Sequence, residues 1–292
     1  MRRMRVSQLY AMRRPVFSFE FFPPKTDAGY RSLYRTIEEL KQLEPSFVSV
    51  TSHARGENRS KTAELVIRIQ NELGITAMAH MTCAGQTPAE LAATLAELAR
   101  SGIENVMALR GDAPNDQPGW RPVRSGFRYA NELAAFVKSR GTFTVGGGCY
   151  PEVHPEAPSA EVDLANLRRK LDAGVEFLIT QLFLNNEHYF RFVERARAAG
   201  ITVPIVPGIM PIVSLANLRG ALRNAPTSET PPALERSLAA AENDKERSLA
   251  IGVEWATQQC RELLMHGAPG IHFYTLNQSP ATRRVHANLA SH

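Results

Sequence analysis

Short apolar runs alternate with amphipathic helical patterns along almost the whole chain of 292 residues. The stretch 29–43, for example, carries Leu33, Ile37 and Leu40 at a helical spacing of three to four residues. Several of these stretches end at a glycine and lead into a run of buried-strand composition. The expected strands are 16–22, 47–51, 76–82, 105–112, 142–150, 176–183, 203–208 and 271–275.

The interval between the last two strands is the longest connection in the chain. It contains a Pro/Ser/Thr-rich stretch, 226–232, and a long helical pattern over 243–266, so we expect extra helices there. With a final helix over 280–289, eight strands each precede a helix. This order favours an α/β fold, a closed (β/α)8 TIM barrel, over an open doubly wound sheet. We expect residues 1–292 to form a single domain, with 1–14 as a basic N-terminal tail or helix.

Charge and cysteine content exclude several classes of protein. The net charge of +5 is modest, and no run of five like charges occurs, so the sequence does not indicate nucleic-acid binding. No apolar segment approaches the roughly 18 residues that a membrane span needs. Cys83, Cys149 and Cys260 lie far apart, without the spacing of a metal site or a disulfide framework. We therefore expect a cytoplasmic protein without a bound metal.

The first expected strand has two unlike faces. Phe17, Phe19 and Phe21 alternate onto one face, and Glu20 lies on the other, just before two prolines end the strand. In a barrel the phenylalanines would pack outward against helices, and Glu20 would face the lumen at the catalytic rim. We expect the apolar strand to keep Glu20 partly protonated. The alternative for such a carboxylate is a structural ion pair.

Polar residues also occur near the ends of other expected strands, where a buried strand should stay apolar. Taken singly, His80 or Gln181 is more often a core polar residue with satisfied hydrogen bonds than a ligand-binding group. Because they are expected together at one rim of the barrel, these residues favour a functional site there. The set is Thr51, His80, Arg110, Asp112, Tyr150, Gln181 and Tyr274.

The segment 150–157 combines polar groups with two prolines and precedes a helix over 159–173. In that helix Asp163, Asn166 and Lys170 share one stripe beside a leucine stripe. By itself, this stripe is typical of a solvated helix flank.

Five ordered motifs resemble those of the methylenetetrahydrofolate reductases. They are 16–25, 110–112, 150–157, Gln181 with its neighbours, and 272–277, and the resemblance runs from about residue 15 to 289. It implies a homo-oligomeric FAD enzyme that uses NADH or NADPH in alternate half-reactions to reduce 5,10-methylenetetrahydrofolate to 5-methyltetrahydrofolate, for methionine synthesis.

The resemblance also implies roles for individual residues. Glu20 would be the general acid, Asp112 would tune the flavin and contact the pterin, and Gln181 would contact the folate and the nicotinamide in turn. Folate contacts would come from Asp112, Gln181, Phe183, Asn217, Tyr274 and Gln278. FAD contacts would come from Thr51, Ser52, Ala54, His80, Arg110, Gly111, Asp112, Tyr129, Ala130, Tyr150, His154, Ala157, Asp163, Asn166, Arg169 and Lys170.

Two segments depart from the family pattern. The family usually has Tyr, Gly and Ala after the second strand, whereas this chain has the segment 52–56, Ser-His-Ala-Arg-Gly. Relatives can also carry a longer amide at Asn217 and a basic residue at Gln278. These changes affect the contacts that would bind the flavin and the folate tail.

Two other functions compete with this interpretation. A barrel lyase or aldolase could use Glu20 as a general base, but it would need a Schiff-base lysine or a metal set at a strand end, and the sequence has neither there. A non-catalytic barrel could bind folate or a phosphate-bearing ligand. Such a binder is expected to have lost the acid, which is present.

Overall fold

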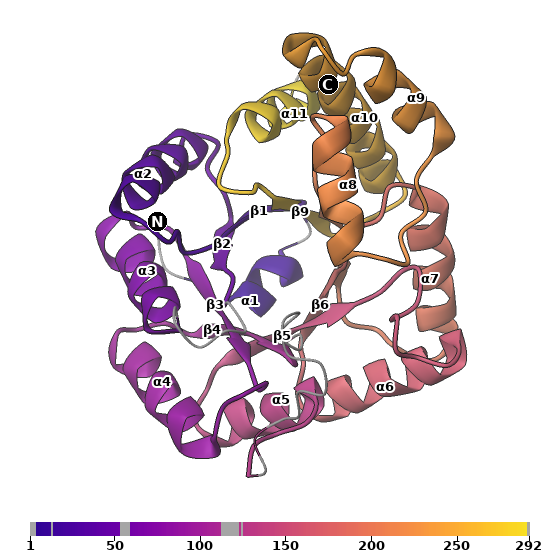
Figure 1. The fold of residues 1–292 in the computed structure, drawn as a ribbon. Helices are drawn as coiled ribbons and strands as arrows, with labels where there is room; N and C mark the ends of the chain where they lie inside the picture. Colours follow the sequence, from indigo (N-terminus) through magenta and orange to yellow (C-terminus); the bar gives the residue numbers. More distant parts are fainter. Residues whose placement is uncertain (1–3, 13, 53–58, 112–122, 124, 291–292) are drawn as a thin grey trace.

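The computed structural model describes residues 4–12, 14–52, 59–111, 123 and 125–290. Within them, parallel strands form a ring that helices surround (Figure 1). Their order in the sheet is β7-β6-β5-β4-β3-β2-β1-β9-β8, and every printed pairing is parallel. The predicted α/β barrel is therefore confirmed. The strands are β1 (Val16–Phe21), β2 (Phe47–Val50), β3 (Ala77–Thr82), β4 (Asn105–Leu109), β5 (Thr144–Cys149), β6 (Phe177–Thr180), β7 (Ile205–Val206), β8 (Gly208–Ile209) and β9 (Gly270–Tyr274).

The single strand predicted over 203–208 is divided into two pieces. Pro207 separates β7 from β8, and a proline cannot donate to a ladder of backbone hydrogen bonds. β7 pairs with β6, whereas β8 pairs with β9. The chain thus changes partner at Pro207, whose carbonyl accepts from the His272 N–H at 3.0 Å. The ring closes at this point.

The helices fill the outer layer as expected. The extra helices expected in the long interval before the last strand number three. The helices after the first strand are α2 (Asp27–Lys41), α3 (Arg59–Glu72), α4 (Pro88–Arg100), α5 (Ala130–Ser139), α6 (Ala160–Asp172), α7 (Asn186–Ala198), α8 (Leu215–Asn224), α9 (Pro232–Ala240), α10 (Lys245–Met265) and α11 (Pro280–Ala290). Within the described part of the chain, none combines the length and apolar character that a membrane span needs.

The basic N-terminal stretch forms a helix, α1 (Val6–Ala11), that lies across the middle of the ring in Figure 1. Val6 and Leu9 are buried against lumen residues that include Phe47 and Phe177. The Val6 N–H donates to Asn105 Oδ1, at the first residue of β4, at 2.8 Å. α1 therefore plugs the barrel at the end where the strands begin, opposite the end where Glu20 lies.

The side chains of β1 point to two opposite faces of the strand, as predicted. Phe19 and Phe21 are fully buried in the main core cluster, together with helix residues such as Leu33 and Ile37. Ser18 and Glu20 lie on the opposite face, in contact with His272 of β9. The alternation along β1 thus delivers Glu20 to the lumen.

Two helical glycines differ in the space around them, and this difference generates a prediction. A Cβ on Gly252 of α10 would lie 1.9 Å from the Ile212 carbonyl oxygen, whereas the nearest heavy atom to a Cβ on Gly220 of α8 is 3.5 Å away. Gly252→Ala should lower the free energy of unfolding by at least about 1–3 kcal/mol, because backbone must move. Gly220→Ala should raise it by about 0.5–1 kcal/mol through helix propensity. Urea denaturation measures both, and equal effects would contradict the packing.

Candidate active site

Glu20 lies near the carboxyl end of β1, inside the ring, with its side chain 19% exposed. Its Oε1 accepts from the Thr51 hydroxyl at 3.0 Å. Its Oε2 lies 3.2 Å from His272 Nε2 and 3.4 Å from His80 Nε2. The carboxylate therefore sits among groups from β1, β3, β9 and the residue after β2.

His272 makes a second contact through its other ring nitrogen. Ser18 Oγ lies 2.7 Å from His272 Nδ1, and both side chains are fully buried. With the proton on Nε2, the imidazole donates to Glu20 and Nδ1 accepts from the Ser18 hydroxyl. This arrangement satisfies both ring nitrogens and favours the ionised carboxylate.

The protonation state of Glu20 differs from the prediction. Burial raises the pKa of Glu20, as the apolar strand suggested, but the nearby His80 and the hydrogen bonds from His272 and Thr51 outweigh burial. The pKa of Glu20 is lowered overall, so the prediction of a partly protonated side chain was wrong. The sequence pattern shows the apolar strand but not the donors that distant strands bring to the carboxylate.

A second group of predicted residues gathers where β5 leads into α6. Tyr150 and His154 pack edge to face, with ring centroids 4.5 Å apart. The His154 N–H donates to Asp163 Oδ2 at 3.0 Å, which ties the loop to α6. Arg110, after β4, binds Glu156 of this loop through two hydrogen bonds of 2.6 Å, and they lower the pKa of Glu156.

Lys170 of α6 points toward the same strand end. Its Nζ donates to the Gly148 carbonyl at 2.8 Å. Burial lowers the pKa of Lys170, and the neighbouring Cys149 and Asp163 oppose this shift. An ammonium held in a desolvated place is stabilised by an anion, so this residue fits a phosphate-bearing cofactor.

The neighbouring rim belongs to Gln181 and Tyr274. The Tyr274 hydroxyl donates to the Thr180 carbonyl at 2.6 Å, and Gln181 Oε1 accepts from the Leu182 N–H at 2.8 Å. The segment after α8 covers this side, because Ser228 Oγ donates to the Leu182 carbonyl and Thr227 Oγ1 donates to the Val153 carbonyl. The structure thus joins the loop after β5 to the loop after β6.

Sequence comparisons show which family has this arrangement. The family model for methylenetetrahydrofolate reductase matches residues 5–290. The chain belongs to this family. It is 38% identical over 264 residues to the 5,10-methylenetetrahydrofolate reductase of Escherichia coli, which covers 90% of this chain and 86% of that protein. It is 37% identical over 288 residues to methylenetetrahydrofolate reductase (NADH) 1 of Arabidopsis thaliana, covering 94% of this chain and 48% of the relative. The chain spans about half the length of its plant and yeast relatives.

Structural comparison supports the barrel fold. A Clostridium thermocellum protein described as binding two copies of 5-methyl-5,6,7,8-tetrahydrofolic acid superposes with a TM-score of 0.65 at 14% identity, covering 97% of this chain and 96% of that one. The dihydropteroate synthase of Stenotrophomonas maltophilia gives a TM-score of 0.52 at 13% identity, with 96% and 93% coverage.

Several residues that the reductase resemblance assigned to the flavin have partners within the protein. Thr51 binds Glu20, and Asn166 Oδ1 accepts from Arg169 at 2.7 Å. Gly111 has φ +83°, a left-handed conformation that suits glycine. The other members lie as follows: Ser52 and Ala157 half-buried, Tyr129 exposed beside Arg128, and Ala130 buried at the start of α5. Ala54 and Asp112 lie outside the described residues. These flavin roles stay predictions.

The assigned folate residues divide between rim and core. Phe183 is fully buried and stacks on Tyr189, with ring centroids 5.7 Å apart, and its contact with folate stays a prediction. Asn217 Oδ1 accepts from the Val213 N–H at the start of α8, a structural contact. Gln278 is exposed after β9. The contacts of Asn217 and Gln278 with folate stay predictions.

Sequence reasoning missed His272 and Ser18 as partners of Glu20. The available signal was the period of two in 270–274, which puts His272 and Tyr274 on one face of the last strand. The structure adds the register, in which Ser18 is opposite His272 and Glu20 is opposite Tyr274.

The lowered pKa of Glu20 predicts a component of acid sensitivity. A carboxyl whose pKa is lower in the folded than in the unfolded state stabilises the fold above its unfolded pKa of about 4.3, and this contribution is lost as pH falls through the folded pKa. Glu20→Gln should therefore flatten the dependence of unfolding free energy on pH below about pH 5. Urea titrations at a series of pH values measure this. Glu97→Gln, at an exposed position of α4, is the control. An unchanged slope for Glu20→Gln would contradict the assignment.

Proposed function

We propose that the chain catalyses the flavin-dependent reduction of 5,10-methylenetetrahydrofolate to 5-methyltetrahydrofolate, with NADH or NADPH as the reductant and methionine synthesis as the destination of the product. Family membership supports the reaction class. The observation that carries the proposal is the Glu20 carboxyl at the lumen rim, held by Thr51 and His272. The resemblance to the family assigns this carboxyl as the acid.

Glu20 is proposed to deliver a proton to N10 of the folate as the five-membered ring opens. The lowered pKa of Glu20 favours the carboxylate, and the acid form is proposed to arise when substrate binds. A pterin over the rim would exclude water from Glu20 and raise its pKa, because desolvation disfavours the charged form. Thr51 and His272 fix the orientation of the carboxyl while it changes protonation state.

FAD is proposed to lie along the loop after β5 and the start of α6. Bound there, it would carry the hydride between the nicotinamide and the folate. Lys170 supplies a buried ammonium for the pyrophosphate, and the Tyr150–His154 pair supplies a rigid surface beside it. Arg110 keeps the loop in place through Glu156.

Folate and nicotinamide are proposed to share the neighbouring rim. Gln181 is half-buried with its amide near the surface, and Tyr274 lies between β6 and the acid. Asp112 is assigned to the pterin and to the flavin by resemblance alone.

The rival activities fit the described residues less well. A Schiff-base lyase needs a lysine at a strand end, but Lys170 lies on α6 and donates to a backbone carbonyl. A non-catalytic binder has no need for a buried carboxylate with such a set of donors. We also infer a cytoplasmic homo-oligomer. The three unpaired cysteines are consistent with that compartment, and the family relationship is the ground for the oligomer.

Replacing the acid should separate the two half-reactions. Glu20→Gln keeps the shape and a hydrogen bond but removes the titrating proton, so flavin reoxidation by methylenetetrahydrofolate should slow by about 10²–10⁴-fold. Flavin reduction by NADH, which needs no acid there, should remain near the wild-type rate. Anaerobic stopped-flow absorbance measures each half. Equal slowing of both would assign Glu20 to the fold or to flavin binding and overturn its role as the acid.

The lysine and a basic neighbour on the same helix give a test of flavin binding. Lys170→Gln should weaken FAD binding by about 10–100-fold, because a charge-assisted contact is lost. Arg168→Gln is the matched control, since Arg168 donates to the Ala199 carbonyl, away from the loop. Flavin content after dialysis and titration of the apoprotein measure both. Full flavin retention in Lys170→Gln would refute this position for the pyrophosphate.

A further inference from the structure

The carboxyl end of β1 is held on one side by side chains instead of a neighbouring strand. β1 and β9 pair as far as Glu20 and Tyr274, and the chain then leaves the ladder. Because peptide groups alternate along a strand, Phe22 is the next residue whose N–H and C=O face that side. The place of Phe22 matters because Glu20 is two residues away, and because prolines, which have no N–H, occupy positions 23 and 24.

Asn277 supplies the two hydrogen bonds that a neighbouring strand would give to Phe22. The Phe22 N–H donates to Asn277 Oδ1 at 3.0 Å, and Asn277 Nδ2 donates to the Phe22 carbonyl at 2.8 Å. A side-chain amide carries an acceptor and a donor, as a peptide unit does, so it can stand in for a residue of β9. The nearby Thr275 hydroxyl donates to the Glu20 carbonyl at 2.6 Å. These hydrogen bonds hold the backbone from Glu20 to Phe22.

An unusual backbone conformation accompanies these contacts. Leu276 and Asn277 have φ of +51° and +57°, a left-handed region that asparagine tolerates far better than leucine. Such conformations persist where surrounding contacts hold them. Here the Asn277 N–H donates to the Thr275 hydroxyl at 3.2 Å, and the Thr36 hydroxyl of α2 donates to the Asn277 carbonyl at 3.3 Å. The loop after β9 is therefore braced against the helix layer.

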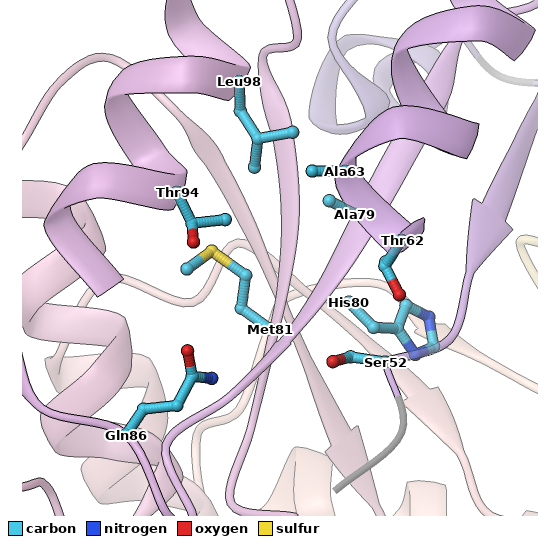
Figure 2. Close-up of a pocket in the computed structure, with 9 residues that line it drawn as sticks. All are labelled: Ser52, Thr62, Ala63, Ala79, His80, Met81, Gln86, Thr94 and Leu98. Carbon is cyan, nitrogen blue, oxygen red and sulfur yellow. The ribbon is translucent and has the colours of Figure 1, made fainter. Parts of the chain in front are cut away.

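The side chains that β2 and β3 bring to Glu20 act on its carboxyl group. Thr51, after β2, donates to Oε1 at 3.0 Å, and His80 Nε2 lies 3.4 Å from Oε2. Figure 2 shows the His80 ring beside Ser52 on that side of the barrel. Thr51 and His80 bear on the charge of Glu20, whereas Thr275 and Asn277 bear on where its backbone lies.

We propose that Asn277 and Thr275 form a clamp that positions Glu20 for proton transfer, an inference that rests on the proposed function. The acid has to lie within hydrogen-bond distance of the folate nitrogen, and misplacement by about 1 Å can cost about 100-fold in rate. Without the clamp, the end of β1 would shift and carry the carboxyl away from a substrate that other elements hold. Both clamp residues contact backbone groups of residues 20 and 22, so they act through Glu20.

Kinetics of the two half-reactions test the clamp in the flavin-loaded enzyme. Asn277→Gly removes the amide but keeps a residue that adopts the left-handed conformation without strain, so it isolates the hydrogen bonds. Flavin reoxidation at saturating methylenetetrahydrofolate should slow by about 10–100-fold, with the half-saturating folate concentration changed less than about threefold. Flavin reduction by NADH, which needs no acid at Glu20, should stay within about twofold of wild type.

Glu44→Gly is the matched control for the change to glycine. Glu44 has φ +50° and is exposed in the loop between α2 and β2, at the end of the barrel away from Glu20. This variant should match wild type in both half-reactions. Within the clamp, Thr275→Val should slow reoxidation, whereas Thr275→Ser, which keeps the hydroxyl, should restore it. Equal slowing of both half-reactions in Asn277→Gly, no slowing of either, or equal rates in the two Thr275 variants would overturn the proposal.

Measurements without turnover separate the clamp from the proposed function. In Asn277→Gly the Phe22 amide should exchange with solvent at least about tenfold faster than in wild type, because its acceptor is gone. The titration midpoint of Glu20, followed by carbon NMR of the carboxyl group, should rise, because a displaced carboxyl loses part of the hydrogen bonding that lowers its pKa. An unchanged exchange rate or an unchanged midpoint would refute the clamp, whatever the reaction is. If both change but folate does not reoxidise the wild-type flavin, the proposed function fails and the clamp on Glu20 stands.

Discussion

The parallel pairing of β1 with β9 is the contact on which the candidate site depends. It joins residues 16–21 to residues 270–274, almost the two ends of the chain. The register sets Ser18 opposite His272 and Glu20 opposite Tyr274. Because side chains alternate along a strand, a shift by one residue would turn Glu20 away from the lumen and His272 away from Glu20. Closure of the ring therefore creates the surroundings of Glu20.

Closure itself depends on an irregular strand. β7 and β8 flank Pro207, and the change of partner there leaves groups that the backbone ladder does not satisfy. Thr180 compensates from both sides, since its hydroxyl accepts from the Gly208 N–H and its carbonyl accepts from the Tyr274 hydroxyl. A Cβ on Gly208 would lie 2.6 Å from the Tyr274 hydroxyl oxygen, so the absence of a side chain makes room for that contact. The seam of the barrel and the rim beside Glu20 thus share residues.

Two opposing effects set the charge of Glu20. Burial favours the neutral acid, and the surrounding imidazoles and hydroxyl favour the carboxylate. The second effect is larger, so the pKa of Glu20 is lowered. A ligand that displaces water from Glu20 would strengthen the effect of burial, and a change in the charge of a neighbouring histidine would alter the opposing effect. The pKa of Glu20 can therefore shift in either direction, as suits a residue that gives up and regains a proton.

The sequence by itself determined the barrel, the inward position of Glu20 and the gathering of polar residues at one rim, because strand and helix periods are local properties of the chain. It did not determine the division of the strand at Pro207, the burial of Phe183, or the contacts of Glu20 with His272 and His80. Those depend on which strands become neighbours and in what register. The direction of the pKa shift at Glu20 follows from the same distant neighbours, so only the tertiary structure decided it.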